Sequence, residues 1–457
     1  MDYIPFDEHT KKSNGLSIKF SDIAGFDYLG TLRIVVTTPD IKVTAGVPST
    51  VAWTWEVIVR AIDVITITSA TITAGPVQYI ITGEQIAESL HWNRDFILRP
   101  DEVVGNIPQL LTFSSHLPSY ENVIKLPLFW DCTKPFPLNL CNDEATTITI
   151  TMKKTRDLLR VRYGNGVDMS YGDPTFTDQV YQGMGIKDES FSGEVEYRPS
   201  NCSDFVNHPD GQLYKHRLVP TYIESISSAA TINRRITLPI TVGKHVLGFM
   251  WHLQPIFLDA RGREMDIHAY GNYSLNPLTG STHDPVCMTT LTITRMNGTT
   301  EPPIHIRGCR SRQPDTKHLN ESFSVGRHIH TFGTHPWRGL KNPGKDIASV
   351  EFVCTSSDQF VAASSLKASN IDISRILAGF SPSQPDKPVD INLDEQESLL
   401  RTSSMLQRQQ QDQNEIPEVR SIAYKLVVFT IVSNQMNITN GKISFDNIPY
   451  KEVKRNK

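Results

Sequence analysis

Hydrophobic and polar residues alternate strictly over residues 147–152, which read TITITM. In an extended chain this period of two places Ile148, Ile150 and Met152 on one face and the threonines on the other. The pattern predicts a strand with one side in a hydrophobic core.

Just before that strand, residues 126–130 read LPLFW, and prolines follow at positions 135 and 137. Proline breaks helices and is tolerated in sheets only at an edge or a strand end. We therefore predict a second strand over residues 126–130, joined to the alternating one by a proline-bent loop. Such a pair belongs to a β-sandwich or a β-barrel.

The rest of the N-terminal half also reads as strands. Segments rich in Val, Ile, Thr and Trp alternate with Gly and Pro turns, and one segment, GEQIAESL at residues 83–90, fits a two-turn helix. The predicted strands cover residues 33–38, 51–60, 62–73 and 77–81. A stretch rich in Gly, Asp and Tyr, residues 163–188, is predicted to form long loops.

A polar, proline-bearing stretch at residues 198–215 indicates a domain boundary, and strand patterns resume after it. They cover residues 219–226, 235–242, 245–257, 288–296, 349–354, 424–432 and 442–446. The two halves are alike at a spacing of roughly 200 residues, which indicates duplication of a whole domain and not a short repeat. The polar, glutamine-rich residues 381–418 are predicted to be an exposed insertion.

Composition narrows the class of protein. A chain of 457 residues is long enough for two or three domains, and a net charge of −4 gives no reason to expect direct nucleic-acid binding. The six cysteines have no paired spacing, so they are predicted to be free thiols made in a reducing compartment. We also expect no signal peptide and no bilayer-spanning segment.

The most suggestive chemistry is the histidine cluster in residues 326–339, GRHIHTFGTHPWRG. On a strand, His328 and His330 would share a face, and His335 could complete a zinc or iron site. The cupin metal motif, however, needs a Glu three or four residues after its second His, where Gly333 and Thr334 stand. Surface or interface histidines are therefore the favoured interpretation, with a metal site as the alternative.

Other catalytic patterns are absent from the sequence, which has no GxSxG, Walker A or GxGxxG motif and no paired acid/base carboxylates. We predict no catalytic residues, no cofactor and no enzymatic activity. The residues expected to form the structural core are Phe129, Trp130, Ile148, Ile150, Met152, Trp251 and Phe429.

Three segments together resemble one family. Residues 126–152 are similar to a block beginning LPLPFWF, residues 243–254 (GKHVLGFMWHLQ) to its HPVKELFWVVQ strand, and residues 424–447 to its closing YSFSLNPE segment. The order and separation of the three resemble the double jelly-roll major capsid proteins of large eukaryotic DNA viruses, as in iridoviruses, phycodnaviruses and marseilleviruses.

The resemblance implies an all-β chain of two tandem eight-stranded jelly-roll barrels, with long loops and a few short helices. The implied domains are an N-terminal arm (1–30), a first jelly roll (31–205) and a second (206–457) that carries the insertion at 381–418. For function it implies a structural capsid protein, three copies of which form a pseudo-hexameric capsomer that tiles an icosahedral shell.

The implied partners are further copies of the chain, first in a homotrimer and then in neighbouring capsomers, together with minor capsid and penton proteins. An internal viral membrane is a further implied partner through the N-terminal arm. The arm could order on assembly or pack under its own barrel, and the sequence favours neither. The implied location is the virion, after assembly in the host cytoplasm.

Three alternatives remain open at this stage. A scaffold protein of the same fold would shape a viral membrane and then be discarded. A jelly-roll metalloenzyme would use His328 and His330. A receptor-binding or lectin-like spike would carry its interactions on exposed loops.

Overall fold

The computed structural model of the chain describes nineteen segments, and the structural statements below concern these alone. They are residues 11–13, 15–23, 25–43, 50–71, 75–92, 100–131, 134–141, 146–162, 168–170, 191–201, 212–226, 235–240, 246–258, 264–265, 273, 285–307, 326–332, 346–356 and 421–445.

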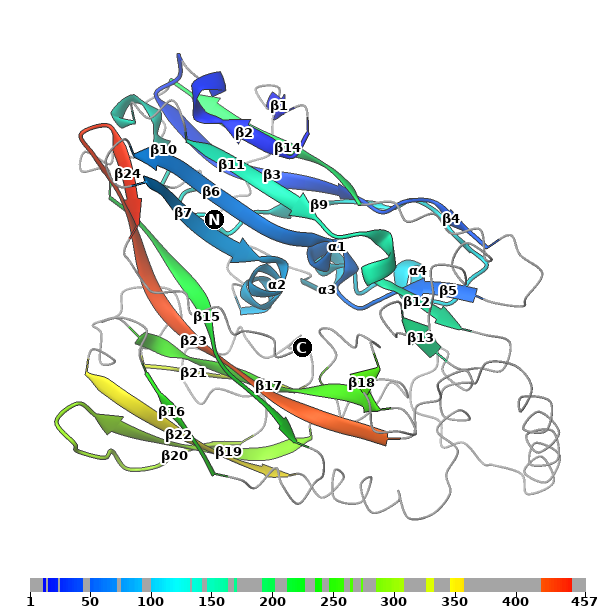
Figure 1. Ribbon diagram of the computed structural model, residues 1–457, viewed down its shortest axis with the longest axis vertical. Coiled ribbons are helices and arrows are strands. Elements are labelled where there is room, and N and C mark those ends of the chain that lie inside the picture. Colours follow the sequence, from blue (N-terminus) through cyan, green and yellow to red (C-terminus); the bar gives the residue numbers. More distant parts are fainter. Residues whose placement is uncertain are drawn as a thin grey trace.

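The first barrel is formed by two facing antiparallel sheets (Figure 1). One sheet has the order β1-β14-β3-β9, and the other has the order β2-β11-β6-β7. Their bounds are β1 (Lys11–Ser13), β2 (Ser17–Lys19), β3 (Tyr28–Thr37), β6 (Ile62–Thr71), β7 (Gly75–Thr82), β9 (Glu121–Lys125), β11 (Thr147–Met152) and β14 (Ser192–Ser200).

The second barrel repeats this arrangement with later strands. One sheet has the order β15-β23-β17-β21, and the other has the order β16-β22-β19-β20. Their bounds are β15 (Gln212–Ile226), β16 (Arg235–Pro239), β17 (Val246–Leu258), β19 (Val286–Arg295), β20 (Ile304–Arg307), β21 (Arg327–Thr331), β22 (Ile347–Ser356) and β23 (Ser421–Thr439).

The strand order is identical in the two barrels. When the strands just given for each barrel are numbered from 1 to 8 along the chain, one sheet reads 1-8-3-6 and the other reads 2-7-4-5. The last strand of each barrel thus lies between the first and the third, as in a jelly roll built from Greek keys. The predicted all-β double jelly roll is confirmed.

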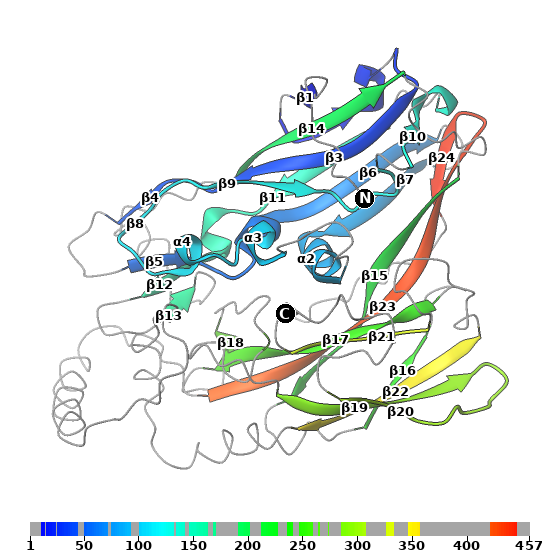
Figure 2. The ribbon, with the colours of Figure 1, turned by 180° about the vertical axis from the view of Figure 1, so that it is seen from behind.

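Shorter elements complete the described chain. A three-stranded sheet and a two-stranded one lie at one end of the first barrel, and four short helices belong to the same half (Figures 1 and 2). The three-stranded sheet has the order β13-β12-β5, and the two-stranded one pairs β4 with β8. Three more short strands extend the main sheets, where β10 pairs with β3, β18 with β17 and β24 with β23. The bounds of these shorter elements are β4 (Ile41–Lys42), β5 (Thr50–Trp53), β8 (His116–Leu117), β10 (Phe136–Pro137), β12 (Leu159–Arg162), β13 (Asp168–Ser170), β18 (Glu264–Met265), β24 (Lys442–Phe445), α1 (Val57–Arg60), α2 (Gly83–Trp92), α3 (Pro100–Val104) and α4 (Pro108–Leu111). Three 3-10 turns cover Phe20–Ile23, Leu138–Leu140 and Thr155–Asp157.

The single strand predicted over residues 51–60 is wrong, because β5 ends at Trp53 and α1 begins at Val57. Between them Glu56 has a φ of 58°, in the left-handed region, which ends the strand. The backbone N–H of Glu56 donates to Oδ1 of Asn106 at 2.7 Å, which holds this turn.

The strand predicted over residues 126–130 is also wrong, although its side chains are buried. Both β9 and β10 pair with β3, and the segment between them leaves the sheet edge instead of continuing the ladder. Pro127 has no backbone N–H, so it cannot donate a hydrogen bond that would continue the strand pairing. Leu126, Leu128, Phe129 and Trp130 turn into the barrel core, each at most 2% exposed.

The described part of the predicted N-terminal arm packs against its own barrel. Strand β1 pairs with β14, β2 pairs with β11, and Ile18 and Phe20 are buried. Residues 1–10 lie outside the described residues, as do the predicted domain junction at 205–206 and the predicted insertion at 381–418.

The last described strands connect the two barrels. Strand β23 pairs with β17 along residues 421–432 and then with β24 along residues 436–439. Met436, Ile438 and Ile443 of this hairpin belong to the hydrophobic core of the first barrel. Figure 1 shows the red hairpin reaching from the second barrel to the edge of the first.

Aromatic rings mark the point where the hairpin enters the first barrel. The ring of Phe445 stacks on Tyr79 at 5.2 Å and lies 5.5 Å from the ring of Phe129. Tyr79 and Phe129 also meet edge to face at 4.7 Å. Since aromatic pairs at these separations attract beyond simple burial, the C-terminal hairpin is a packed part of the first core. No helix among the described residues is long and apolar enough to cross a membrane.

Candidate functional site

The residues predicted for the structural core lie in three places. Phe129, Trp130, Ile148 and Ile150 are at most 3% exposed within the first barrel, and Met152 is half-buried against the same core. Trp251 is fully buried inside the second barrel. Phe429 is 1% exposed but belongs to a separate small cluster on the outer face of the sheet that contains β17 and β23.

The histidine pair of β21 faces the interior of the second barrel. In register, His328 lies opposite Trp251 and His330 lies opposite Phe249. The ring of His328 stacks on Trp251 at 5.6 Å, and burial lowers the pKa of His330 to about 4. No group of three metal-ligating side chains occurs among the described residues, and His335 lies outside them.

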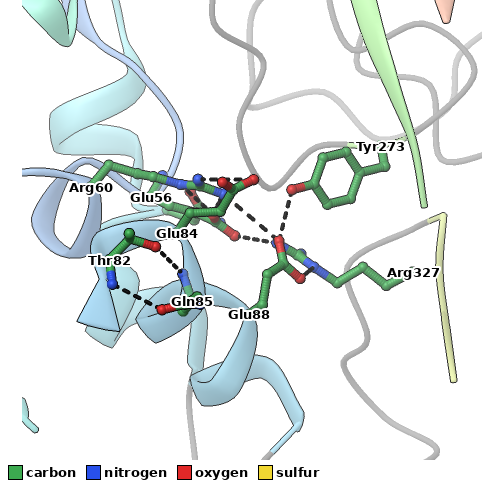
Figure 3. Close-up of polar contacts among 9 residues, drawn as sticks. Glu56, Arg60, Thr82, Glu84, Gln85, Glu88, Tyr273 and Arg327 are labelled. Carbon is green, nitrogen blue, oxygen red and sulfur yellow. Dashed lines mark hydrogen bonds and ion pairs between the residues drawn. The ribbon is translucent and has the colours of Figure 1, made fainter. Parts of the chain in front are cut away.

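The opposite face of β21 carries a different site, which lies between the barrels. Arg327 pairs in register with His252 of β17, and both are fully buried. Across from them lie Glu56, Arg60 and Glu88 of the first barrel, each at most 2% exposed. We call these five residues, together with Tyr273, the inter-barrel cluster. Figure 3 labels every member except His252.

Arg327 joins two carboxylates of the first barrel. Its Nη2 lies 2.6 Å from Oε1 of Glu56, which precedes α1, and 3.1 Å from Oε1 of Glu88 on α2. Its Nε donates to Oε2 of Glu88 at 2.8 Å. The second contact is bidentate, a geometry that the planar guanidinium favours and that fixes orientation as well as distance.

Arg60 binds the same two carboxylates from within the first barrel. Its Nη2 lies 3.0 Å from Oε2 of Glu56 and 3.7 Å from Oε1 of Glu88. A third carboxylate, Glu84, lies 4.0 Å from its Nη1 at the exposed rim. The buried core of the cluster therefore holds two formal positive and two formal negative charges.

Tyr273 and His252 cover the cluster on the side of the second barrel. The hydroxyl of Tyr273 donates to Oε1 of Glu88 at 2.8 Å, and its ring lies 4.6 Å from the guanidinium carbon of Arg327. His252 stacks on the same ring, with centroids 3.7 Å apart and planes 10° from parallel. Figure 3 shows Tyr273 and Arg327 reaching toward Glu88 from the second barrel.

The local backbone explains why these side chains meet. Helix α2 begins with a capping box, in which Gln85 N–H donates to Thr82 Oγ1 at 3.3 Å and Thr82 N–H donates to Gln85 Oε1 at 3.0 Å. The side-chain amide of Gln85 then donates to the Leu218 carbonyl of β15 at 2.9 Å, so α2 is bonded directly to the second barrel.

Gly326 allows Arg327 to approach from the other side. Its φ is +84°, and a Cβ there would lie 2.1 Å from the carbonyl oxygen of Tyr273. Only glycine tolerates both the left-handed backbone and this close contact. The site thus depends on a residue with no side chain.

The electrostatics of the cluster favour the fully charged state. Burial acts to raise the pKa of the Glu88 carboxyl, but the charge of Arg327 overcomes it and lowers the pKa to about 2. Burial likewise acts to lower the pKa of both guanidinium groups, and the carboxylates raise it above the usual arginine value. Burial raises the pKa of Tyr273 well above 10, so its hydroxyl stays a hydrogen-bond donor.

This arrangement is suited to holding two bodies in one orientation. The carboxylates are already bonded to guanidinium groups and are removed from solvent, which leaves them poorly placed to accept protons from a substrate. Buried ion pairs add little net stability, but breaking one leaves an uncompensated charge at a cost of about 3–5 kcal/mol. A buried apolar cluster that contains Met250, Ile329 and Phe429 lies beside it.

The sequence analysis did not identify any member of the inter-barrel cluster. One signal was present: Glu56 and Arg60 flank the apolar run of residues 57–59. Arg327 follows a glycine at the start of strand β21, RHIHT. What the sequence does not contain is the pairing, since Glu56 and Arg327 are 271 residues apart.

Comparison with known proteins gives a match of structure alone. No family model matches the sequence. No curated protein matches it either.

Among solved structures, the chain is similar to PBCV-1 Vp54, as fitted into a reconstruction of the virophage Sputnik, and to the subunit of a quasi-atomic PBCV-1 capsid. Each comparison has a TM-score of 0.53 at 10% sequence identity and covers 98% of both chains. The faustovirus major capsid protein matches with a TM-score of 0.47 at 9% identity, covering 96% of this chain and 92% of its own. The first two comparisons show that the chain has the double jelly-roll fold of these capsid proteins.

Proposed function

We propose that this chain is a major capsid protein, a structural subunit of the icosahedral shell of a large double-stranded DNA virus. The observation that carries the proposal is the exact repeat of strand order in two barrels within one chain. The likeness to PBCV-1 Vp54, which extends over 98% of both chains, supports it.

The duplication has a geometric consequence. Three copies of a chain with two similar barrels place six similar bodies around one axis, so a three-fold oligomer presents nearly six-fold edges to its neighbours. This works only if the two barrels keep a fixed relative orientation. The inter-barrel cluster and the shared C-terminal hairpin supply that constraint.

The partners follow from this role. The proposed assembly is a homotrimer that contacts neighbouring capsomers and then minor capsid and penton proteins, with an internal membrane beneath the shell. We propose the virion as its location, after assembly in the host cytoplasm, and no enzymatic activity. Protein-to-protein contacts of moderate area, repeated many times, suit a shell whose misplaced units must be able to dissociate.

The test is the oligomeric state of the purified chain, measured by light scattering and imaged by negative-stain electron microscopy. We expect a mass three times that of the chain and a hexagonal outline in projection. A stable monomer at micromolar concentration would count against the proposal.

Purified mature particles provide a second measurement. A capsid subunit is expected to be their most abundant protein. A chain found on immature membranes but absent from mature particles would instead be a scaffold of the same fold.

A further inference from the structure

His252 is an unusual member of the inter-barrel cluster. Its side chain is fully buried, yet neither ring nitrogen has a hydrogen-bond partner among the described residues. A neutral imidazole carries one donor and one acceptor, and leaving either unpaired when buried costs about 1–3 kcal/mol. The closed interface therefore holds a group that water would solvate better.

Four charged groups among the described residues act on this imidazole. Glu88 lies on α2, and Arg327 lies on the neighbouring strand β21. Glu56 precedes α1, and Arg60 is its last residue. Tyr273 covers the ring itself. Since Arg60 and Arg327 already balance Glu56 and Glu88, a protonated His252 would add an unbalanced positive charge to a buried site.

We propose that the inter-barrel cluster is an acid-sensitive contact, in which His252 must be neutral for the two barrels to stay together and takes up a proton when they separate. The proposal concerns the single chain and does not depend on its capsid role. It assigns to His252 a regulatory function.

The direction of the pH dependence follows from the two states of His252. In the closed state burial lowers the pKa of His252 from its ordinary 6.5 to about 3. The negative charge of Glu88 acts to raise this pKa, and the positive charge of Arg327 acts to lower it. In the open state the ring meets water and its pKa returns toward 6.5. Between pH 6.5 and 3 only the open state binds the proton, so acidification favours opening.

These two pKa values of His252 set how strongly acid increases the fraction of molecules in the open state. From pH 7 to pH 5 one such proton raises the open fraction roughly 20- to 30-fold. Glu88 acts in the same direction, but only below its ordinary pKa of 4.5, because its closed-state pKa is about 2. At pH 5 and above, the response belongs to His252.

Hydrogen exchange of the full-length chain tests this, with rates corrected for the intrinsic effect of pH. We expect protection of α2 amides to fall roughly 20- to 30-fold between pH 7 and pH 5, with a slope approaching one proton below pH 6.5. Amides of β22, which lies in the far sheet of the second barrel, should keep their protection. This measurement needs no variant.

A matched pair of variants then identifies the residue. His252→Phe keeps an aromatic ring against Tyr273 and should abolish the pH response of α2. His330→Phe replaces a histidine on the opposite face of the same sheet, whose pKa is also lowered, and should leave that response intact.

Three results would overturn the proposal. The first is protection of α2 amides that does not change from pH 7 to pH 5. The second is an equal loss of protection in β22, which would indicate global unfolding. The third is an unchanged pH response of α2 in a folded His252→Phe variant.

Discussion

At the scale of single residues, Arg327 contributes most to the relation between the barrels. It comes from the second barrel, but both of its carboxylate partners belong to the first. Buried ion pairs are often no more stable than apolar residues of similar volume, so their value lies in specifying one arrangement. A bidentate contact to Glu88 and a second contact to Glu56 leave the side chain one orientation.

Replacing Arg327 with Met is expected to lower the free energy of unfolding by about 3–5 kcal/mol, because Glu56 and Glu88 would lose a buried partner. Urea denaturation followed by circular dichroism measures this. Arg295→Met, which breaks a partly exposed pair with Glu301, is the control and should cost at most about 1 kcal/mol.

A double variant separates charge from packing. Adding Glu88→Gln to Arg327→Met leaves Arg60 and Glu56 as a balanced pair, so part of the lost stability should return. If the double variant is less stable than Arg327→Met by the full cost of a second independent change, uncompensated charge is not the cause.

The sequence predicts single residues well where local alternation decides their environment. Ile148 and Ile150 alternate with threonines, and the structure buries both against the first core. Burial of Glu56, Glu88 and Arg327 cannot be read from alternation, because a charge is buried only when a partner distant in sequence meets it. Burial of these residues depends on how two domains dock, which no local pattern encodes.

At the scale of elements, the C-terminal hairpin β23–β24 is shared between two cores. Its early part completes a sheet of the second barrel, and its end fills the first. Ile443 is 1% exposed there. The hairpin therefore stabilises a barrel to which it does not belong by chain order.

Replacing Ile443 with Ala is expected to destabilise the first barrel by about 2–5 kcal/mol, through lost burial and the cavity that remains. Hydrogen exchange should show reduced protection in β6 and β7, which lie beside β24, before any change in β19. Ile223→Ala, at a site 45% exposed on β15, is the control and should have an effect within about 0.5 kcal/mol. A loss of protection confined to the second barrel would contradict the shared core.

Strands and helices were predictable where apolar and polar residues alternate or where a helix begins with a capping motif. Strand β11 and helix α2 lie close to their predicted positions, and the capping box at Thr82 accounts for the latter. Residues 126–130 misled the prediction, because an apolar run with prolines can be buried without joining a ladder. Strand β14 was missed, although Val195 and Tyr197 alternate with charged residues.

At the scale of the whole molecule, the two barrels are joined by more than their linker. Buried charge, an apolar cluster and a strand that spans both cores connect them. Ordinary domain interfaces within a chain are more polar and allow relative motion. This one resembles a continuous interior.

We therefore expect the two barrels to unfold together. Differential scanning calorimetry at pH 7.5 should show one transition whose calorimetric and van't Hoff enthalpies agree. Arg327→Met should broaden or divide it, because it weakens the joint without touching either barrel core. Two resolved transitions in the wild-type chain would show that the barrels are independent.

The sequence predicted the class and the duplication of the whole fold, since both halves repeat one period-two pattern. It did not predict how the barrels face each other. That relation depends on α1 and α2, which lie on the side of the first barrel that faces the second, and on side chains that meet across about 270 residues of chain.

The shared hairpin also determines when the first barrel can be completed during synthesis. Met436, Ile438 and Ile443 are translated more than two hundred residues after the last described strand of that barrel, β14. A ribosome-bound or prematurely terminated chain therefore presents a first barrel with an open apolar gap beside Tyr79, where the missing hairpin would pack. Chaperones and proteases recognise such surfaces. Only a chain translated through this hairpin can close both barrels, so the fold itself discriminates against truncated products.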